Sequence, residues 1–247
     1  MVPDGAPRSL PTALGKKVKF DWVPVLKLCK WVLEQTDTTV SKEVPYWADE
    51  DKDWSWTRNA IAHLLESALS RASDDLELSL RAEVWDVLHK LTQDPEPTPE
   101  RETPKKGQDR DPVHIAINST RGVAMLGVTY YATWLRYHCE RLKDGAARVA
   151  RGFDEMPEVR EVLDLHLEPS VDPTRAIRSV YGMRLPWIRL VDSRWTQLNL
   201  DRIFPESDTQ RDFWEAAWAA YLTHCPAYHM MTCSRRLKVN TLWRSSV

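Results

Sequence analysis

The chain has 247 residues, of which 43% are hydrophobic and 28% are charged, as is usual for a soluble globular protein. Its 34 Lys and Arg residues nearly balance 36 Asp and Glu residues, and the formal net charge of −2 argues against a dedicated binder of nucleic acid or membrane surfaces. No apolar run approaches the ~20 residues that cross a bilayer, and the N-terminus lacks a signal-peptide core, so we expect a cytoplasmic protein without a membrane partner.

Eight glycines and twelve tryptophans favour an all-α fold. Few glycines disfavour β-hairpins and phosphate-binding loops, whereas each indole ring can bury about 200 Å² between packed helices. We therefore predict an irregular helical bundle or a HEAT-like α-solenoid segment.

The N-terminal half is predicted to hold a basic, disordered segment, 1–20, followed by a helical subdomain, 21–93. Asp21 is a suitable N-cap for the first helix, and two more helices follow with apolar residues three and four positions apart. Residues 94–112, DPEPTPERETPKKGQDRDP, contain five prolines and no large apolar residue. That composition predicts a linker or a long exposed loop.

A C-terminal helical-repeat domain is predicted over 113–247. Asp111 as N-cap and Pro112 at the first helical position indicate one long helix over 111–138. Further helices are expected from Pro157 to about 168, from Asp172-Pro173 to about Gly182, over 210–222, and beyond Pro226 to about Leu242.

Small and polar residues interrupt the apolar pattern of the long helix at Asn118, Ser119, Arg121 and Gly122. One interpretation is a polar network that fixes helix register, in which an acid or free helix carbonyls meet Arg121, because an unpaired buried Arg is costly. The other is a ligand contact by Asn118 and Arg121, three positions apart. We favour the network, with Gly122 and Gly127 allowing neighbouring backbones to approach.

Three aromatic residues, Trp214, Trp218 and Tyr221, share one face of the helix over 210–222. If exposed, this face is a candidate interface for a partner helix. Burial between helices is the alternative that we favour.

The sequence HCPAYHMMTC offers His224, Cys225, His229 and Cys233 as soft zinc ligands. Pro226 interrupts their helical spacing, so we favour core or interface roles and expect no cofactor.

Three further sets of residues have functional interpretations that we do not favour. Cys139 would be an activated thiol if it paired with His138, but adjacent helix positions point about 100° apart and do not pair naturally. Asp111 is better explained as a helix cap than as a metal ligand with Asp109 and His114. The acidic run over 49–53 is expected to be a solvated loop.

Two motifs carry a family resemblance. AINSTRG, at the start of the long helix, and DFWEAAWAAYL downstream resemble helical-repeat regions of large bacterial ATP-binding proteins, including STAND-type NTPases of antiphage defence. The resemblance covers about 111–225 and implies a fragment or free-standing relative of such a region. No Walker A or Walker B motif is present, so any NTPase activity would belong to another protein.

Together these patterns predict a non-enzymatic scaffold or sensor that binds a protein partner, such as an NTPase or a phage protein. The alternatives are a metal-dependent enzyme or zinc module built on helices, and a nucleic-acid-binding protein that uses its basic ends, although nucleic acid is disfavoured by the net charge.

Overall fold

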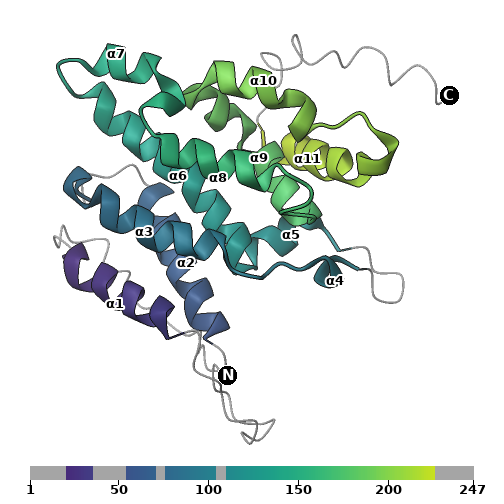
Figure 1. Ribbon diagram of the computed structural model, residues 1–247, viewed down its shortest axis with the longest axis horizontal. Helices are drawn as coiled ribbons and strands as arrows, with labels where there is room; N and C mark the ends of the chain where they lie inside the picture. Colours follow the sequence, from purple (N-terminus) through teal and green to yellow (C-terminus); the bar gives the residue numbers. More distant parts are fainter. Residues whose placement is uncertain (1–20, 36–53, 71–75, 104–109, 226–247) are drawn as a thin grey trace, which may run out of the picture.

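The computed structural model describes residues 21–35, 54–70, 76–103 and 110–225, and the regular secondary structure of these ranges is entirely helical (Figure 1). The predicted all-α bundle is confirmed, whereas the solenoid alternative stays a prediction. The α-helices are α1 (Trp22–Glu34), α2 (Ser55–Ser70), α3 (Arg81–Thr92), α4 (Pro99–Glu102), α5 (Pro112–Ile117), α6 (Thr120–Glu140), α7 (Gly145–Ala150), α8 (Pro157–His166), α9 (Arg175–Val191), α10 (Ser193–Ile203) and α11 (Arg211–His224).

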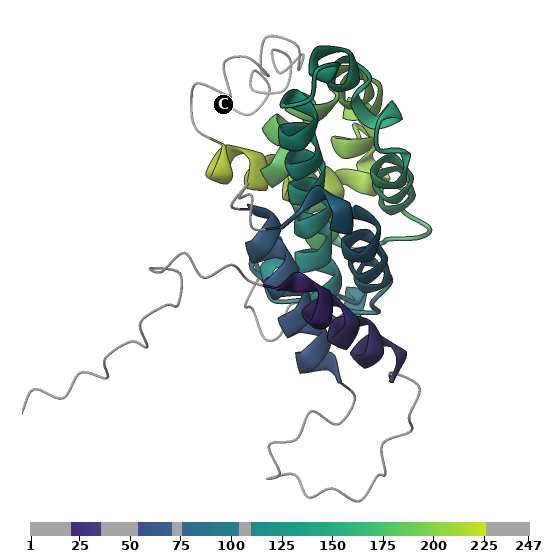
Figure 2. The ribbon, with the colours of Figure 1, turned by 90° about the vertical axis from the view of Figure 1, so that its left-hand side faces the viewer.

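Helix α6 is the central element of the bundle (Figures 1 and 2). It packs against α2, α3 and α9, and α9 packs in turn against α10 and α11. Most of α6 is buried, including Tyr131 and Trp134. A helix that is apolar nearly all round is packed on several sides, as α6 is. Helix α1 lies at the outer edge of the molecule, against α2 and α3.

The hydrophobic core continues across the predicted boundary at 94–112. Leu26 of α1 and Tyr221 of α11 belong to the same cluster of buried residues. The two helical halves, as far as the structure describes them, therefore share one core. The predicted N-terminal segment 1–20 lies outside the described residues.

The segment 94–112 differs from the exposed linker that its composition predicted. Its described part contains α4, and both Asp94 and Glu102 are buried. The Glu102 carboxylate accepts hydrogen bonds from the backbone N–H groups of Arg175 (2.8 Å) and Ala176 (2.6 Å). Because these N–H groups begin α9 and lack partners within the helix, the segment is held to the bundle by polar contacts that hydropathy does not reveal.

The prediction of a single helix over 111–138 is wrong, because Asn118 and Ser119 divide this stretch into α5 and α6. Asp111 caps α5 as predicted. Ser119 then adopts an extended backbone (φ −135°, ψ 147°), and the Asn118 side chain donates to the carbonyl of His114 (2.8 Å). Small polar side chains thus compete with the helix for backbone groups and end α5.

Gly122 allows α5 to fold back against the first turn of α6. A Cβ atom at this position would lie 2.1 Å from the carbonyl oxygen of Ala116. The predicted close approach of two backbones is therefore confirmed at Gly122. At Gly127 the neighbour is a side chain instead, since a Cβ there would meet Leu88 at 2.9 Å.

The remaining helix ends agree with the sequence in part. Asp21 caps α1 and Pro157 opens α8, as predicted. Helix α9 is longer than predicted, because it continues through Pro186 to Val191 instead of ending near Gly182. Helix α11 matches the prediction over 210–222, and the helix expected beyond it lies outside the described residues. None of the described helices combines the length and the apolar character that a membrane crossing requires.

Candidate functional site

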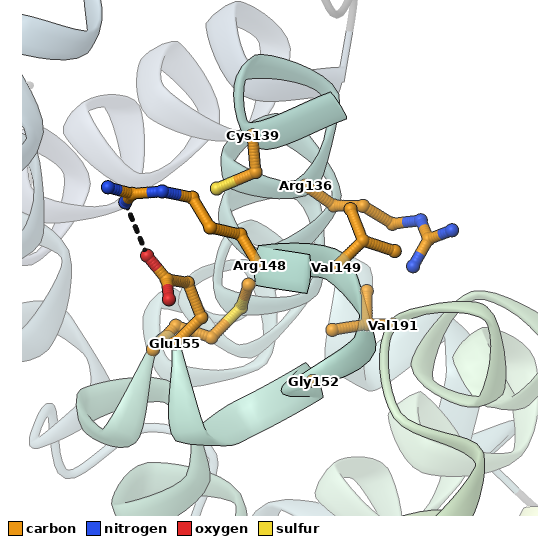
Figure 3. Close-up of a pocket in the computed structure, with 8 residues that line it drawn as sticks. Arg136, Cys139, Arg148, Val149, Gly152, Glu155 and Val191 are labelled. Atoms are coloured by element: carbon orange, nitrogen blue, oxygen red, sulfur yellow. Dashed lines mark hydrogen bonds and ion pairs between the residues drawn. The ribbon is translucent and has the colours of Figure 1, made fainter. Parts of the chain in front are cut away.

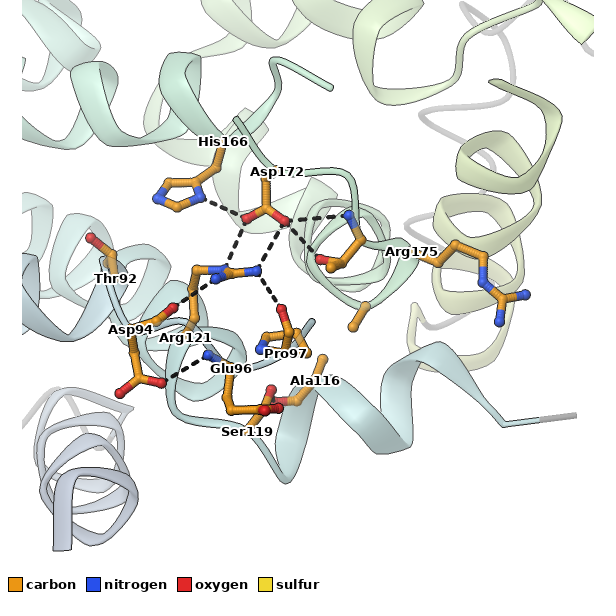
Figure 4. A network of polar contacts seen from close by, with 12 residues as sticks. Thr92, Asp94, Glu96, Pro97, Ala116, Ser119, Arg121, His166, Asp172 and Arg175 are labelled. Atoms are coloured by element: carbon orange, nitrogen blue, oxygen red, sulfur yellow. Dashed lines mark hydrogen bonds and ion pairs between the residues drawn. The ribbon is translucent and has the colours of Figure 1, made fainter. Parts of the chain in front are cut away.

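Arg121, the cation of the predicted polar network, lies near the start of α6 with 12% of its side chain exposed (Figure 4). Its guanidinium donates to the carbonyl oxygens of Asp94 (2.6 Å) and Pro97 (2.5 Å), and its Nε lies 3.1 Å from a carboxylate oxygen of Asp172. Its backbone N–H donates to the carbonyl of Glu96 (2.9 Å). Arg121 therefore joins the Pro-rich segment to the loop that precedes α9.

Asp172 is the anion at the centre of this network. It accepts hydrogen bonds from Thr174 Oγ1 (2.7 Å) and contacts His166 Nδ1 at 2.8 Å. Burial alone would raise the pKa of Asp172, but the His166 hydrogen bond and the Arg121 charge outweigh it and hold that pKa below its usual range. The carboxylate is thus ionised at neutral pH and compensates the buried guanidinium.

The network extends to α2 through Asp94. Its carboxylate accepts hydrogen bonds from Arg58 Nε (2.6 Å) and from the backbone N–H of Glu96 (2.9 Å). Side chains from α2, α6 and α8 therefore meet on two carboxylates, Asp94 and Asp172, that lie in loops. Such a cluster fixes the relative positions of helices, because each buried polar group is costly unless it keeps its partners.

The structure separates the three residues that sequence grouped together. Ser119 is buried and donates to the carbonyl of Ala116 (3.2 Å). Asn118 is exposed, and its side-chain amide donates to a backbone carbonyl of α5. Arg121 instead points into the network around Asp172. Asn118 and Arg121 therefore do not present their side chains to one ligand.

The His166–Asp172 contact has the form of an acid–base pair, in which a carboxylate orients an imidazole. Here the same carboxylate also holds Arg121 and Thr174, and His166 is buried. The carboxylate contacts more groups than an orienting role needs. The arrangement is that of a structural cluster, and sequence gave no signal for it because His166 lies more than forty residues from Arg121.

A small pocket that opens to solvent lies beside Cys139 of α6 (Figure 3). Arg148 of α7 crosses it to donate to the Glu155 carboxylate (2.7 Å). Burial raises the pKa of the Cys139 thiol, and the Glu155 charge raises it further. A protonated thiol is a weak nucleophile, so the pocket is poorly suited to cysteine chemistry. The neighbouring His138 ring packs edge-on against Trp134.

Helix α9 carries another buried cation, Arg184. Its Nε donates to Thr129 Oγ1 (2.9 Å), and its guanidinium lies between the rings of Tyr130 (4.0 Å) and Trp187 (4.2 Å). Burial lowers the pKa of Arg184. Aromatic faces and the charge of Glu66 favour the guanidinium at this position.

The aromatic face predicted on α11 turns inward. Tyr221 is buried, and Trp214 and Trp218 are half-buried against the core with their rings stacked at 5.7 Å. Phe204 meets Trp218 edge-on. Tyr221 is therefore not exposed, whereas Trp214 and Trp218 keep part of their surface accessible.

Only half of the candidate zinc set lies within the described residues. His224 is exposed at the end of α11, whereas Cys225 is buried with its Sγ 3.9 Å from the carbonyl of Gly182. His229 and Cys233 lie outside the described residues, as do Asp109 and the acidic run over 49–53. Within the described ranges, no three His, Cys, Asp or Glu side chains are grouped as metal ligands.

Large apolar side chains are exposed on α1 and at the start of α2. We call Val23, Leu28, Trp31 and Trp56 the N-terminal aromatic surface; Trp31 and Trp56 are 52% and 66% exposed. Trp54 contacts Trp31 edge-on and so places the start of α2 beside α1. Trp54 also has a left-handed backbone (φ 60°), which is rare for a bulky residue and concentrates at functional sites.

Sequence reasoning missed this surface, although α1 contained a signal for it. The inward stripe of α1 includes Leu26, Cys29 and Val32. Leu28 and Trp31 lie outside that stripe, so the helix carries apolar residues on two faces. A helix at the edge of a bundle needs only one apolar face for the core, and the second face indicates an interaction surface.

Comparison with protein-family models, curated proteins and solved structures found no match. The resemblance of the two motifs to helical-repeat regions of bacterial NTPases therefore stays a prediction.

Proposed function

We propose that this chain is a non-enzymatic helical module that binds a protein partner through the N-terminal aromatic surface. The observation that carries the proposal is the exposure of Trp31 and Trp56 together on neighbouring helices. Tryptophan is among the residues most enriched at the centres of protein interfaces, where its large ring is released from water.

The polar residues favour a binding module over an enzyme. Arg121, Asp172 and His166 are committed to one another and to backbone carbonyls, and the pKa of Cys139 is raised. These groups stabilise the fold, whereas the aromatic residues of α1 and α2 contribute only part of their area to it. Binding to a bacterial defence NTPase belongs to the same proposal and is supported by the two sequence motifs alone.

Photo-crosslinking tests the proposal. We would replace Trp56 with p-benzoylphenylalanine in the full chain and irradiate cells that express it, with the same substitution at exposed Gln197 of α10 as the matched control. We expect a discrete protein adduct from position 56 that disappears when Trp31→Glu is added to the same chain. Equal adducts from positions 56 and 197, or none from position 56, would refute the proposal.

A further inference from the structure

The exposed face of α1 carries one cation and one anion on either side of Trp31. At 100° per residue, Lys27, Trp31 and Glu34 lie on the same side of the helix, and all three are exposed. Lys27 precedes Trp31 by one turn and Glu34 follows it by about one turn. Neither charged side chain forms an ion pair with any other residue of the described ranges, so both are available to an external partner.

Two copies of α1 that run in opposite directions bring these unlike charges together. If a second α1 lies antiparallel across the first, with Trp31 near the two-fold axis, each Lys27 faces the partner's Glu34. The two charges are seven residues, or about 10 Å, apart on each helix, so both ion pairs can form together. A parallel arrangement would place Lys27 against the partner's Lys27, which is unfavourable.

The exposed apolar area also suits a symmetric dimer. At 52% and 66% exposure, Trp31 and Trp56 offer about 300 Å² together. Leu28 and Val23, at 59% and 44%, add about 150 Å². A standard interface buries about 800 Å² on each partner, of which about 60% is apolar, and the summed exposed area of these four side chains is close to that apolar share.

We infer that the occupant of the N-terminal aromatic surface is a second copy of this chain, whose α1 packs antiparallel on α1. The inference rests on the proposed function and names its partner. Closed two-fold symmetry is the commonest form of assembly, because one self-complementary surface satisfies both subunits.

Charge exchange on α1 provides the test. Sedimentation velocity of the full chain, over a concentration series, measures association of the wild type, Lys27→Glu, Glu34→Lys and the double variant. We expect the wild type to form a species of twice 28.6 kDa. Each single variant should raise the dimer Kd about tenfold, because two attractive pairs become repulsive, and the double variant should restore it. Glu34→Lys places a cation in the last turn of α1, where the helix dipole favours it, so the variants are expected to fold.

The possible outcomes distinguish failure of the second-copy inference from failure of the proposed function. A wild type that stays monomeric, or a double variant no tighter than the single variants, would overturn the second-copy inference. If position 56 nevertheless crosslinks to a different protein, the proposed function stands without this partner. If the wild type stays monomeric and position 56 yields no adduct, both proposals fail.

Discussion

Replacing Arg121 with Met would separate the structural interpretation of this residue from the ligand-binding one. The substitution keeps most of the apolar stem and removes the guanidinium, whose side chain is 12% exposed and whose partner Asp172 is 1% exposed. Asp172 would then be a buried charge without its cation, and the carbonyl groups of Asp94 and Pro97 would lose their donor. Removing one partner of a buried ion pair typically costs about 3–5 kcal/mol, and we expect a loss of that size in the free energy of unfolding.

Urea unfolding followed by circular dichroism at neutral pH measures this loss, which is a large part of the 5–15 kcal/mol typical of a domain. Arg160→Met is the matched control, because Arg160 and Asp154 form an ion pair of 2.6 Å that is 43% and 69% exposed. Exposed pairs contribute about 0–1 kcal/mol, so the control should change stability little. If Arg121→Met cost no more than Arg160→Met, the network would not hold the fold, and the reasoning that assigns Arg121 to structure would be wrong.

Four other substitutions or conditions have defined outcomes. Gly182→Ala should destabilise the chain by about 1–3 kcal/mol in urea unfolding, because a Cβ there would lie 1.9 Å from the backbone oxygen of Ala217; an unchanged midpoint would contradict that contact. The folded-state pKa of Asp172 lies below its ordinary value, so its contribution to stability should be complete above about pH 4 and lost as pH falls through the folded pKa. Asp172→Asn should flatten the pH profile of stability in that acidic range. Cys139 should react slowly with iodoacetamide in the native chain and at the rate of an ordinary thiol in urea, as followed by peptide mass spectrometry, because burial raises its pKa; equal rates would show an accessible thiolate. Arg184→Met should change stability by less than about 1 kcal/mol in urea unfolding, because the cost of losing the ring contacts is offset by removing a charge whose burial is unfavourable.

Helical periodicity was sufficient to predict the fold class and much of the helix layout. Asp21, Asp111 and Pro157 mark the starts of α1, α5 and α8 because capping and proline preferences act within a few residues. The central position of α6 also followed from its sequence, since apolar residues surround that helix. These features depend on local chemistry, which one sequence contains in full.

The errors arose where distant residues decide the structure. The Pro-rich segment is held in place because Glu102 binds the N-terminus of α9 and Arg121 binds the carbonyls of Asp94 and Pro97. These contacts join residues more than twenty positions apart, and composition alone therefore predicted a free linker. A similar limit applies to the polar network: the need for an acid near Arg121 was predictable, but its identity as Asp172 depended on the packing of α8 and α9.

The energetic difference between the polar network and the N-terminal aromatic surface is the reason to place function on α1 and α2. A ligand that engaged Arg121 would have to displace Asp172 and two backbone carbonyls. Breaking these contacts would cost about 3–5 kcal/mol of stability, the loss expected for Arg121→Met. A partner that covers Trp31 and Trp56 displaces water from their exposed surface, and the release of that water favours association. Binding at the aromatic surface therefore leaves the contacts that stabilise the bundle intact, whereas binding at the network would compete with the fold itself.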